Sequence, residues 1–519
     1  MQGWVKPIFH TGVCRRAKAG EFTLRRLRLM GIRCHEMPVL NYLDLIAIGA
    51  YFVILLIIGL RVMRSAKGED EVESFLAADR DMGLAQTTAS TAATDLGGGF
   101  SIAMGGLGFT LGLSASWLVA ISALSVVLVS FLMVPKVKRW SDRVRGLTTG
   151  DLFEARFDAR TGTMAAVVIG LAWFSFVGGQ VIAGGKLLQV TLDLDLTVAI
   201  VVAGGVILAY TAMGGLKAVI YTDVFQMIVL LIGILFLMVP IGFYKIGGWG
   251  AMVAHFEAVD ATQSMLSFSA IGWKQLVGWF LAIFPVWFIS IAAMQRIVAA
   301  RDEKTATRAF LLTGVPIEWP LFAIGSTLVG MFARMLMPDL SDPELATPMM
   351  IMTLLPAGIA GFVIAAYIAA VMSTADSCLI GPVAIFTNDI YHKRINPHAT
   401  SAQLMSVARV TTLLMGALAI LMAYLVPNVL DLILYAYTFG AAGLFFPMLG
   451  LLFWPRTTAT GAFWSIILGG SSAVIWTLLG EPWGFAASYL GWFVGLPSLV
   501  LISLLTAHST EEDLDLFRV

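Results

Sequence analysis

An otherwise apolar stretch of the chain, AAVMSTADSCL, contains three hydroxyl side chains and a carboxylate. In helical register Ala370, Ser373, Thr374 and Ser377 share one face, with Asp376 at its edge. A lone hydroxyl in a membrane helix usually donates to the carbonyl four residues earlier. A carboxylate near the centre of a bilayer costs roughly 2.5–3.5 kcal/mol, so Asp376 is expected to face a partner or a hydrated cavity. Such a stripe of oxygens could bind a small hard cation such as sodium.

Two further apolar stretches contain residues that weaken a helix near its middle. The first, TTASTAATDLGGGFSIAMGGLGF, places Asp95 just before three consecutive glycines. The second, WFLAIFPVWFISIAAMQR, contains Pro285, which removes a backbone donor and loosens the turn before it. Broken helices at corresponding positions of two repeats indicate an inverted-repeat transporter that holds its ligands at the breaks. The alternative is that the glycines only let neighbouring helices pack closely.

The composition places these stretches in a membrane. Of the 519 residues, 58% are hydrophobic and only 13% are charged, which is too little charge for a soluble globular protein of this size. Apolar runs of about 20 residues recur, and no alternating pattern of barrel strands is present. The sequence predicts an all-α polytopic membrane protein with about 13 transmembrane helices. The expected spans are residues 41–62, 83–108, 114–135, 163–189, 195–213, 219–243, 273–295, 310–334, 356–380, 403–426, 429–453, 461–479 and 485–506.

Basic residues indicate the orientation. They gather in the loops after the odd-numbered spans, RVMRSAK, KVKRWSDRVR, GGLKAV, QRIVAARDEK, HKR and WPR, and such loops are usually cytoplasmic. The prediction is a multi-pass protein of the plasma (inner) membrane, with its N-terminus outside and its C-terminus cytoplasmic. Lys186 is expected to extend its amine to the outer interface beside Asp193 and Asp195, and contact with a carboxylate is the alternative.

The first 36 residues conflict with that orientation, because they carry eight Lys and Arg residues and would have to lie outside. They also lack the apolar core of a signal peptide. We therefore expect residues 1–36 to be a doubtful extension and translation to start at Met37, although a tolerated extension is the alternative. Residues 37–506 then form the transmembrane domain, and residues 507–519 form a short cytoplasmic tail.

Other kinds of chemistry find little support. Cys14, Cys34 and Cys378 form no disulfide framework or thiolate metal site. A net charge of zero and six scattered histidines do not suggest nucleic-acid binding or a zinc site. The chain has no Walker A loop, nucleophile elbow or paired metal ligands, so we expect no catalytic residues, no enzyme activity and no cofactor apart from a coupling ion.

A third carboxylate, Asp223, lies in GGLKAVIYTDVFQ at the start of the sixth expected span, where pairing with the helix dipole would alone explain it. Three segments resemble characteristic segments of the sodium:solute symporter family, and they occur in the same order and spacing. They are GGLKAVIYTDVFQ, AAVMSTADS and AATDLGGG. That family includes sodium-coupled sugar, proline, sialic acid, pantothenate and monocarboxylate carriers. The likeness extends from Met37 to about residue 506. It implies a LeuT-like fold, a five-plus-five inverted repeat in which the ninth span and the two broken spans surround the ligands.

The resemblance also implies roles for individual residues. The principal sodium site would combine three backbone carbonyls with two hydroxyls, from Ala93, Leu96, Ala370, Ser373 and Thr374. A site for a second cation, or for sodium release, would use Asp223, Asp376 and Ser377. Residues that fall where family members line the solute pocket are Asp95, Gly97, Phe100, Trp287 and Tyr437. Several family members carry a hydroxyl at the position of Gly97, which leaves a side-chain contact there open.

The sequence thus predicts a secondary active transporter that couples inward sodium movement to uptake of a small organic solute by alternating access. Few polar side chains near the first break favour an organic anion or an amino acid. Proton coupling through Asp95, Asp223 or Asp376 is one alternative, and a transporter-like sensor or channel is another. The expected partners are the solute, sodium and the lipid bilayer, with no nucleic acid and no obligate protein partner.

Overall fold

The computed structural model describes residues 40–65, 77–259, 264–426 and 428–507. Within these ranges the chain is helical, apart from short connections and one isolated bridge between Met82 and Ala300. Residues 1–36, the proposed start at Met37 and residues 508–519 of the expected tail lie outside the described ranges.

The helices of the first half are α3 (Tyr42–Ser65), η1 (Ala78–Arg80), α5 (Leu84–Asp95), α6 (Gly98–Leu111), η2 (Gly112–Ser116), α7 (Trp117–Leu132), α8 (Val134–Val144), α9 (Thr149–Arg156), α10 (Ala159–Thr191), α11 (Leu196–Leu231), η3 (Ile232–Met238), α12 (Val239–Ile246) and α13 (Gly248–Val259). The helices of the second half are η4 (Ser264–Leu266), α14 (Trp273–Ile283), α15 (Val286–Ile289), α16 (Ile291–Ala299), α17 (Glu303–Leu312), η5 (Thr313–Phe322), α18 (Ala323–Leu336), η6 (Pro343–Leu345), α19 (Ala346–Leu354), α20 (Ile359–Ala384), η7 (Ile385–Ile395), α21 (Ser401–Leu425), α22 (Val429–Phe453), α23 (Ala459–Leu478), η8 (Pro482–Gly484) and α24 (Ala487–Leu505).

Eleven helices in the described part of the chain are long and apolar enough to cross a membrane, and Leu196–Thr211 forms a shorter apolar helix. The expected count of 13 is therefore not confirmed, although the polytopic all-α architecture is. One reason is local sequence: the expected second span is divided, and its first part, α5, is rich in threonine and alanine. A second reason is that the rest of that span is counted together with the third expected span as Gly98–Leu132. A third is that the expected fifth span is short: Leu196–Thr211 ends before the non-helical Gly215 of α11 (φ 64°), where the span Gly215–Ile246 begins.

The two expected interruptions are both present. The first span of the pair breaks between α5 and α6. The second is divided into α14, α15 and α16, with Pro285 before α15 and an extended Ser290 after it. Pro285 suits the position just before a helix, because an N–H at that position would have no acceptor within the helix and proline has none to satisfy.

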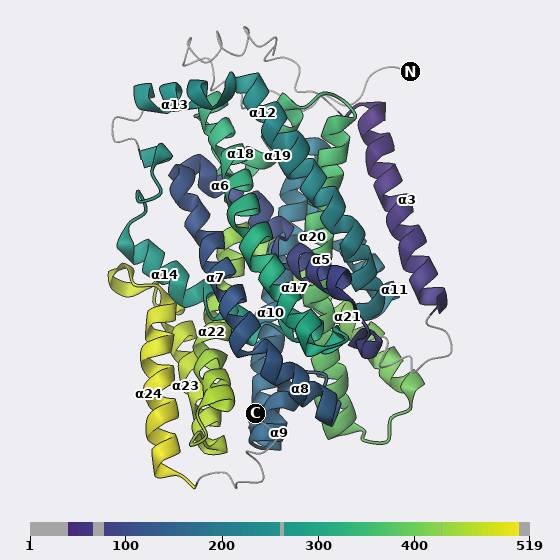
Figure 1. The fold of residues 1–519 in the computed structure, drawn as a ribbon, viewed down its shortest axis with the longest axis vertical. Helices are drawn as coiled ribbons and strands as arrows, with labels where there is room; N and C mark the ends of the chain where they lie inside the picture. The colour runs from purple at the N-terminus through teal and green to yellow at the C-terminus, as the bar shows by residue number, and fades with distance from the viewer. Residues whose placement is uncertain (1–39, 66–76, 260–263, 427, 508–519) are drawn as a thin grey trace.

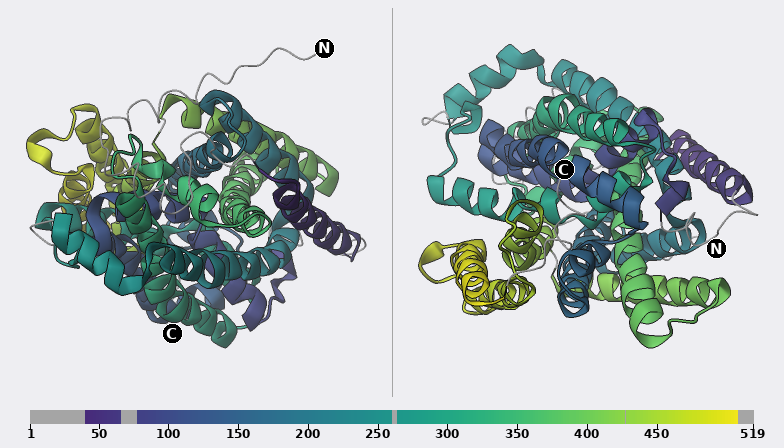
Figure 2. Two further views of the ribbon diagram at one scale, coloured as in Figure 1. Left: turned by 90° about the horizontal axis from the view of Figure 1, so that it is seen from above. Right: turned by 60° about the horizontal axis from the view of Figure 1, so that its bottom comes forward.

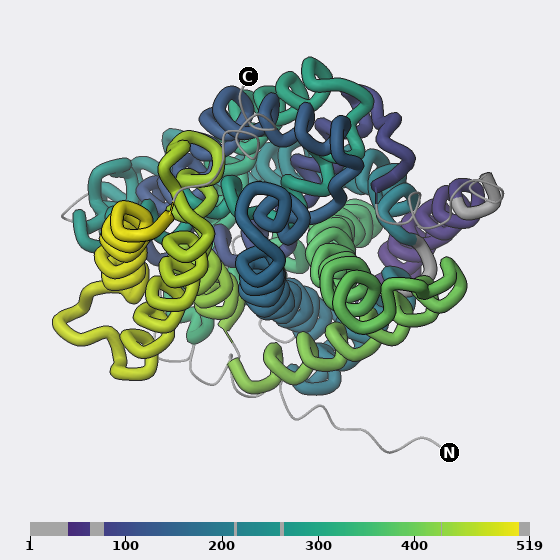
Figure 3. The backbone as a smooth tube through the Cα atoms, turned by 90° about the horizontal axis from the view of Figure 1, so that it is seen from below, coloured from purple at the N-terminus to yellow at the C-terminus, as the bar shows by residue number. Residues whose placement is uncertain are grey.

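Helix α20 lies in the middle of the bundle and α3 and α24 lie on opposite flanks (Figure 1). The views from above and from below agree on this arrangement (Figures 2 and 3). In α20, 94% of the most apolar window is buried inside the protein, against 22% in α3 and 28% in α24. The polar stripe of α20 therefore faces other helices rather than lipid.

The described chain begins and ends at opposite ends of the bundle. In Figure 1, α3 starts at the top and α24 finishes at the bottom, where α8 and α9 also lie. Helix α8 has the sequence VPKVKRWSDRV and carries four basic residues, so the bottom end is the basic one. This layout agrees with an odd number of crossings, while the orientation in a membrane stays a prediction.

Candidate functional site

The chain leaves the helical conformation between Asp95 and Gly98. Close approach explains the glycines that follow: a Cβ added to Gly97 would lie 2.2 Å from Thr374 Oγ1, and one added to Gly98 would lie 2.0 Å from Val371 Cγ2. Both neighbours belong to α20. The glycines thus both accompany the break and let α6 lie directly against α20.

The two central hydroxyls of α20 meet the end of α5. Ser373 Oγ donates to the carbonyl of Ala93 at 2.9 Å and lies 3.2 Å from that of Ala370. Thr374 Oγ1 lies 2.8 Å from the carbonyl of Thr94 and 3.2 Å from that of Ala93. Both hydroxyl side chains are fully buried. Four of the five expected sodium ligands are therefore brought together across the break.

The fifth expected ligand, Leu96, has a different contact. Its carbonyl accepts a hydrogen bond from Ser101 Oγ at 2.9 Å, and the described hydrogen bonds do not connect it to Ser373 or Thr374. The carbonyl of Thr94, which was not predicted, joins the cluster instead. Uncharged carbonyl and hydroxyl oxygens in a buried setting fit a weakly held hard cation. The sodium role of this group stays a prediction.

One turn further along α20, Ser377 belongs to a cluster centred on Arg296 of α16. The guanidinium donates to Asp223 at 3.1 Å, to Thr94 Oγ1 at 2.8 Å and to Ser90 Oγ at 3.0 Å, and it also contacts Ser377. Arg296 is 1% exposed and Asp223 is fully buried. The cluster ties together α5, α11, α16 and α20, and a guanidinium already balances the charge of Asp223.

Asp376 lies apart from that cluster. One of its oxygens accepts from Thr211 of α11, and the other has no hydrogen-bond partner among the described residues. Of the three residues expected to bind a second cation, Asp223 and Ser377 thus share Arg296, while Asp376 faces Thr211.

The five expected solute-lining residues fall into separate groups. The Asp95 carboxyl lies 3.5 Å from Ser122 Oγ of α7 and close to the carboxyl group of Glu318 in η5. The indole of Trp287 donates to the same Ser122 at 2.9 Å. Neither carboxylate oxygen of the buried Glu318 has a hydrogen-bond partner among the described residues. Asp95 and Trp287 therefore meet at α7, and Gly97 meets α20.

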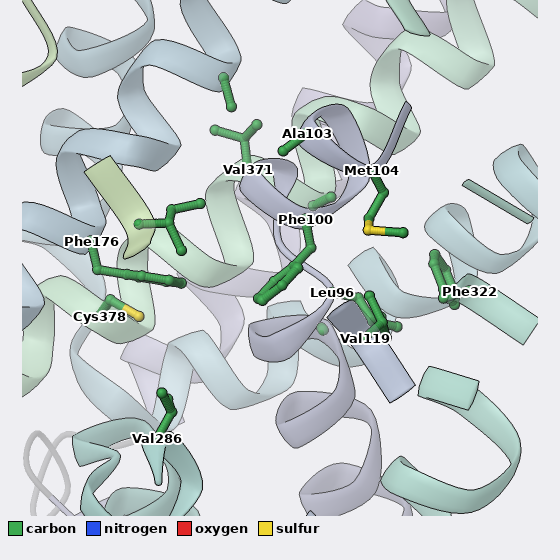
Figure 4. Packing of buried hydrophobic residues seen from close by; sticks show 14 of the residues in the cluster. Leu96, Phe100, Ala103, Met104, Val119, Phe176, Val286, Phe322, Val371 and Cys378 are labelled. Carbon is green, nitrogen blue, oxygen red and sulfur yellow. The ribbon is translucent and has the colours of Figure 1, made fainter. Parts of the chain in front are cut away.

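Phe100 and Tyr437 belong to an aromatic cluster with two residues of α10. Tyr437 stacks on Phe176 with ring centroids 5.2 Å apart, and Trp173 meets Tyr437 edge-on at 6.1 Å. The centroid of Phe100 lies 6.3 Å from that of Tyr437. Figure 4 shows the rings of Phe100 and Phe176 directed toward each other. A cavity beside Trp173 and Tyr437 measures about 10 Å³, so side chains fill this region.

Three buried polar residues near these groups were missed from sequence. Arg296 was assigned to the basic loop QRIVAARDEK, but it is buried inside α16, so that part of the assignment is wrong. Glu318 lies between two prolines in VPIEWP, and Gln180 is the one amide in the expected span 163–189 apart from its last residue, Gln189. A search for isolated polar residues in spans would have found Gln180 and Glu318. The position of Arg296 at a span end gave no such signal.

Lys186 also differs from expectation. Instead of reaching the interface beside Asp193 and Asp195, its amine bonds Asp342 at 2.7 Å and Glu344 at 2.6 Å. The Lys186 side chain is 3% exposed. The carboxylate pair on η6 provides a better site for the amine than the interface, because it satisfies a charge that α10 holds inside the protein.

Comparisons with known proteins identify the family. Residues 75–469 match the model of the sodium:solute symporter family. The high-affinity proline transporter PutP of Bacillus subtilis is 28% identical over 468 residues, which cover 87% of this chain and 96% of the relative. A sodium/proline symporter of Staphylococcus aureus is 26% identical over 499 residues, covering 92% of this chain and 94% of the relative.

The fold is shared with solved transporters. A sodium-coupled sialic acid symporter in a substrate-bound outward-open state superimposes with a TM-score of 0.74 at 22% identity, covering 91% of this chain and 99% of that one. A nucleobase-cation-symport-1 family transporter in a closed conformation gives a TM-score of 0.55 at 15% identity, covering 85% and 97%. These likenesses confirm the LeuT-like fold expected from the sequence. The chain belongs to the sodium:solute symporter family.

Proposed function

We propose that the protein is a sodium-coupled symporter that moves a small organic solute into the cell by alternating access. The observation that carries the proposal is the meeting of Ser373 and Thr374 with the carbonyl of Ala93, across a break in the facing helix. Such a site uses groups from two elements, so a cation bound there favours the conformations in which α5 and α20 are together. Coupling requires that the solute favour the same conformations.

The membrane potential would add to the drive. One sodium ion moving inward across 100 mV, inside negative, contributes about 2.3 kcal/mol before its concentration gradient is counted. Under this proposal the bottom of the bundle in Figure 1, with the basic helix α8, is cytoplasmic, and the chain begins outside.

The solute is proposed to be an organic anion or an amino acid. Proline is a candidate because the named relatives are proline carriers. The aromatic cluster around Tyr437 offers an apolar surface for the body of such a solute.

The direct test is uptake in proteoliposomes of a labelled panel: proline, pyruvate, acetate, pantothenate, sialic acid, glucose and choline. A sodium gradient and a proton gradient are imposed separately. We expect accumulation of at least one solute with sodium, and its loss in Ser373→Ala/Thr374→Ala. Thr412→Ala is the matched control, since that buried hydroxyl donates only within its own helix, to Ala408 at 2.8 Å. Sodium-independent uptake that the double variant leaves unchanged would overturn the proposal.

A role for Asp223, Asp376 and Ser377 in binding a second cation is supported less well. Arg296 already occupies the polar side of Asp223 and Ser377, so a second sodium there would require the guanidinium to move away. Sodium release is the better supported role for this cluster, because its contacts join the helices on the basic side of the candidate sodium site.

Proton coupling is the second candidate, and the contact between Glu318 and Asp95 favours it. Two buried carboxyl groups this close cannot both be ionised without a large electrostatic cost, so the pair is a candidate carrier of a single proton. A pH gradient without sodium should then drive uptake in the wild type but not in Glu318→Gln. If Glu318→Gln leaves transport unchanged under both gradients, this candidate is excluded.

A further inference from the structure

Gln180, near the middle of α10, is completely buried and only half satisfied. Its Oε1 accepts a hydrogen bond from the N–H of Gly99 at 3.0 Å, and its Nε2 has no partner among the described residues. The orientation of this amide is fixed, because only the oxygen can accept from a backbone N–H. A buried amide donor without an acceptor loses its hydrogen bonds to water and gains none in return, which is destabilising. A polar group that is unpaired at such a cost is expected to have a ligand.

The amide lies over the first turn of α6. A Cβ added to Gly99 would be 2.7 Å from Gln180 Nε2, so the donor is in contact with the helix start. Helix α6 contains 14 residues and has no side-chain cap at Gly97. Its first N–H groups have no helical acceptors, and the aligned peptide dipoles place partial positive charge at this end. Gly99 is the one residue of this turn whose N–H reaches a described side chain, and that side chain is Gln180.

The donors converge in surroundings without a counter-charge. The neighbouring cation, Arg296, is bound to Asp223, and Lys186 is bound to η6. Asp95 is directed to Ser122 and Glu318. Donors at a helix start plus an amide, with both neighbouring cations already paired to carboxylates, suit a small anion with one negative charge.

The walls around this point are apolar. Ile433 of α22 lies close enough that a Cβ on Gly99 would meet it at 2.4 Å. The rings of Phe100, Phe176 and Tyr437 fill the adjoining space. A solute body would take the place of one or more of these rings, which favours an apolar body of similar size.

We propose that Gln180 and the first turn of α6 bind a carboxylate of the transported solute, and that the solute is therefore a small monocarboxylate with a largely apolar body. The inference rests on the proposed symport function and assigns its substrate class. Gln180 would act as a specificity-determining residue, since its Nε2 donor distinguishes a carboxylate from a neutral or cationic group.

The test measures binding to the purified protein by tryptophan fluorescence, in sodium chloride and in choline chloride. The carboxylate probes are L-proline, cyclopentanecarboxylate, propionate, pyruvate and pantothenate. The neutral or cationic probes are L-prolinamide, propionamide, glucose and choline. We expect sodium-dependent binding of at least one carboxylate and none of its amide counterpart. Binding of neutral probes alone, or of no carboxylate at all, would overturn the inference.

Variants then test the residue. Gln180→Glu, which keeps the size but replaces the donor by a like charge, should weaken carboxylate binding about 10- to 100-fold. Gln180→Leu should weaken it similarly and reduce the preference for acid over amide. Gln226→Leu, at another buried amide, is the matched control, since Gln226 Nε2 contacts Tyr51 at 3.2 Å, away from α6. An unchanged acid-to-amide preference in Gln180→Leu would contradict the assignment.

A wrong carboxylate subsite and a wrong symport function would give different results. If sodium still changes the fluorescence and Ser373→Ala/Thr374→Ala abolishes that change, while acids and amides bind alike, only the carboxylate subsite is wrong. If sodium has no effect on binding or uptake in the wild type, the symport function itself is wrong.

Discussion

Arg296 is a charged residue in surroundings that exclude water. It is a fully charged side chain, buried in the bundle, and its positive charge is matched by a single carboxylate, Asp223. Removing one member of a buried ion pair leaves the other charge uncompensated. This destabilises the folded protein far more than replacing both members by apolar residues.

Asp223→Ala should therefore lower the free energy of unfolding by about 3–5 kcal/mol. Asp223→Leu combined with Arg296→Met should cost much less than Asp223→Ala alone, because no charge is left unpaired. Thermal unfolding of the purified variants measures both. Glu303→Gln is the comparison: its pair with Arg139 is well exposed, so a loss under about 1 kcal/mol is expected. Equal losses for the single and the double variant would contradict the pairing argument.

The residues that sequence reasoning found best were those whose type is improbable in a membrane. The oxygens of Ser373 and Thr374 and the glycines after Asp95 stand out against apolar neighbours, and the structure places them in contact. The direction of the Asp95 carboxyl could not be predicted, because a break in a helix removes the regular spacing that fixes which neighbour a side chain faces. The partner of Asp223 was hidden for a related reason: Arg296 is 73 residues away in the chain.

At the scale of elements, the glycine run allows α6 to approach α20 closely. Adding a methyl group at Gly97 would require Thr374 or the backbone to shift, since the new carbon would lie 2.2 Å from the threonine oxygen. Gly170, inside α10, has no atom within 4 Å of an added Cβ.

Gly97→Ala should accordingly destabilise the protein by about 1–3 kcal/mol through overpacking, and it should weaken the sodium response by displacing Thr374. Gly170→Ala should be neutral or stabilising by up to about 1 kcal/mol, because alanine favours a helix more than glycine does. Thermal unfolding with and without sodium compares the two. A Gly97→Ala protein with a wild-type sodium response would argue against close packing at the break.

Helix boundaries followed from sequence where local rules decide them. Pro285 marks the start of α15, and the apolar runs mark most spans. The expected division between spans 195–213 and 219–243 also agrees with the structure, where the non-helical Gly215 separates the short apolar helix Leu196–Thr211 from the span Gly215–Ile246.

At the scale of the whole molecule, Lys186 connects three parts of the bundle at the end opposite the basic helices. It lies in α10, its two carboxylates lie at η6, and Glu344 also accepts from the backbone N–H groups of Val429 and Leu430 at the start of α22. Lys186, the two carboxylates and the two backbone N–H groups therefore form one hydrogen-bonded network, which joins α10, η6 and α22.

The two carboxylates should not contribute equally. Glu344 is 8% exposed and serves both Lys186 and α22, whereas Asp342 is 39% exposed. Glu344→Gln should lower the unfolding free energy by about 2–4 kcal/mol, and Asp342→Asn by under about 1 kcal/mol. Thermal unfolding of the purified variants provides the measurement. A larger loss for Asp342→Asn would mean that the exposed pair holds the amine.

The filled space around Tyr437 has a kinetic consequence. A cavity of about 10 Å³ has room for roughly one water molecule, so a solute has to wait for the stacked rings of α10 and α22 to separate. Collective helix motions of that kind take microseconds to milliseconds. In a stopped-flow experiment the observed association rate would then rise with solute concentration only at first, and level off at the rate at which the protein itself opens.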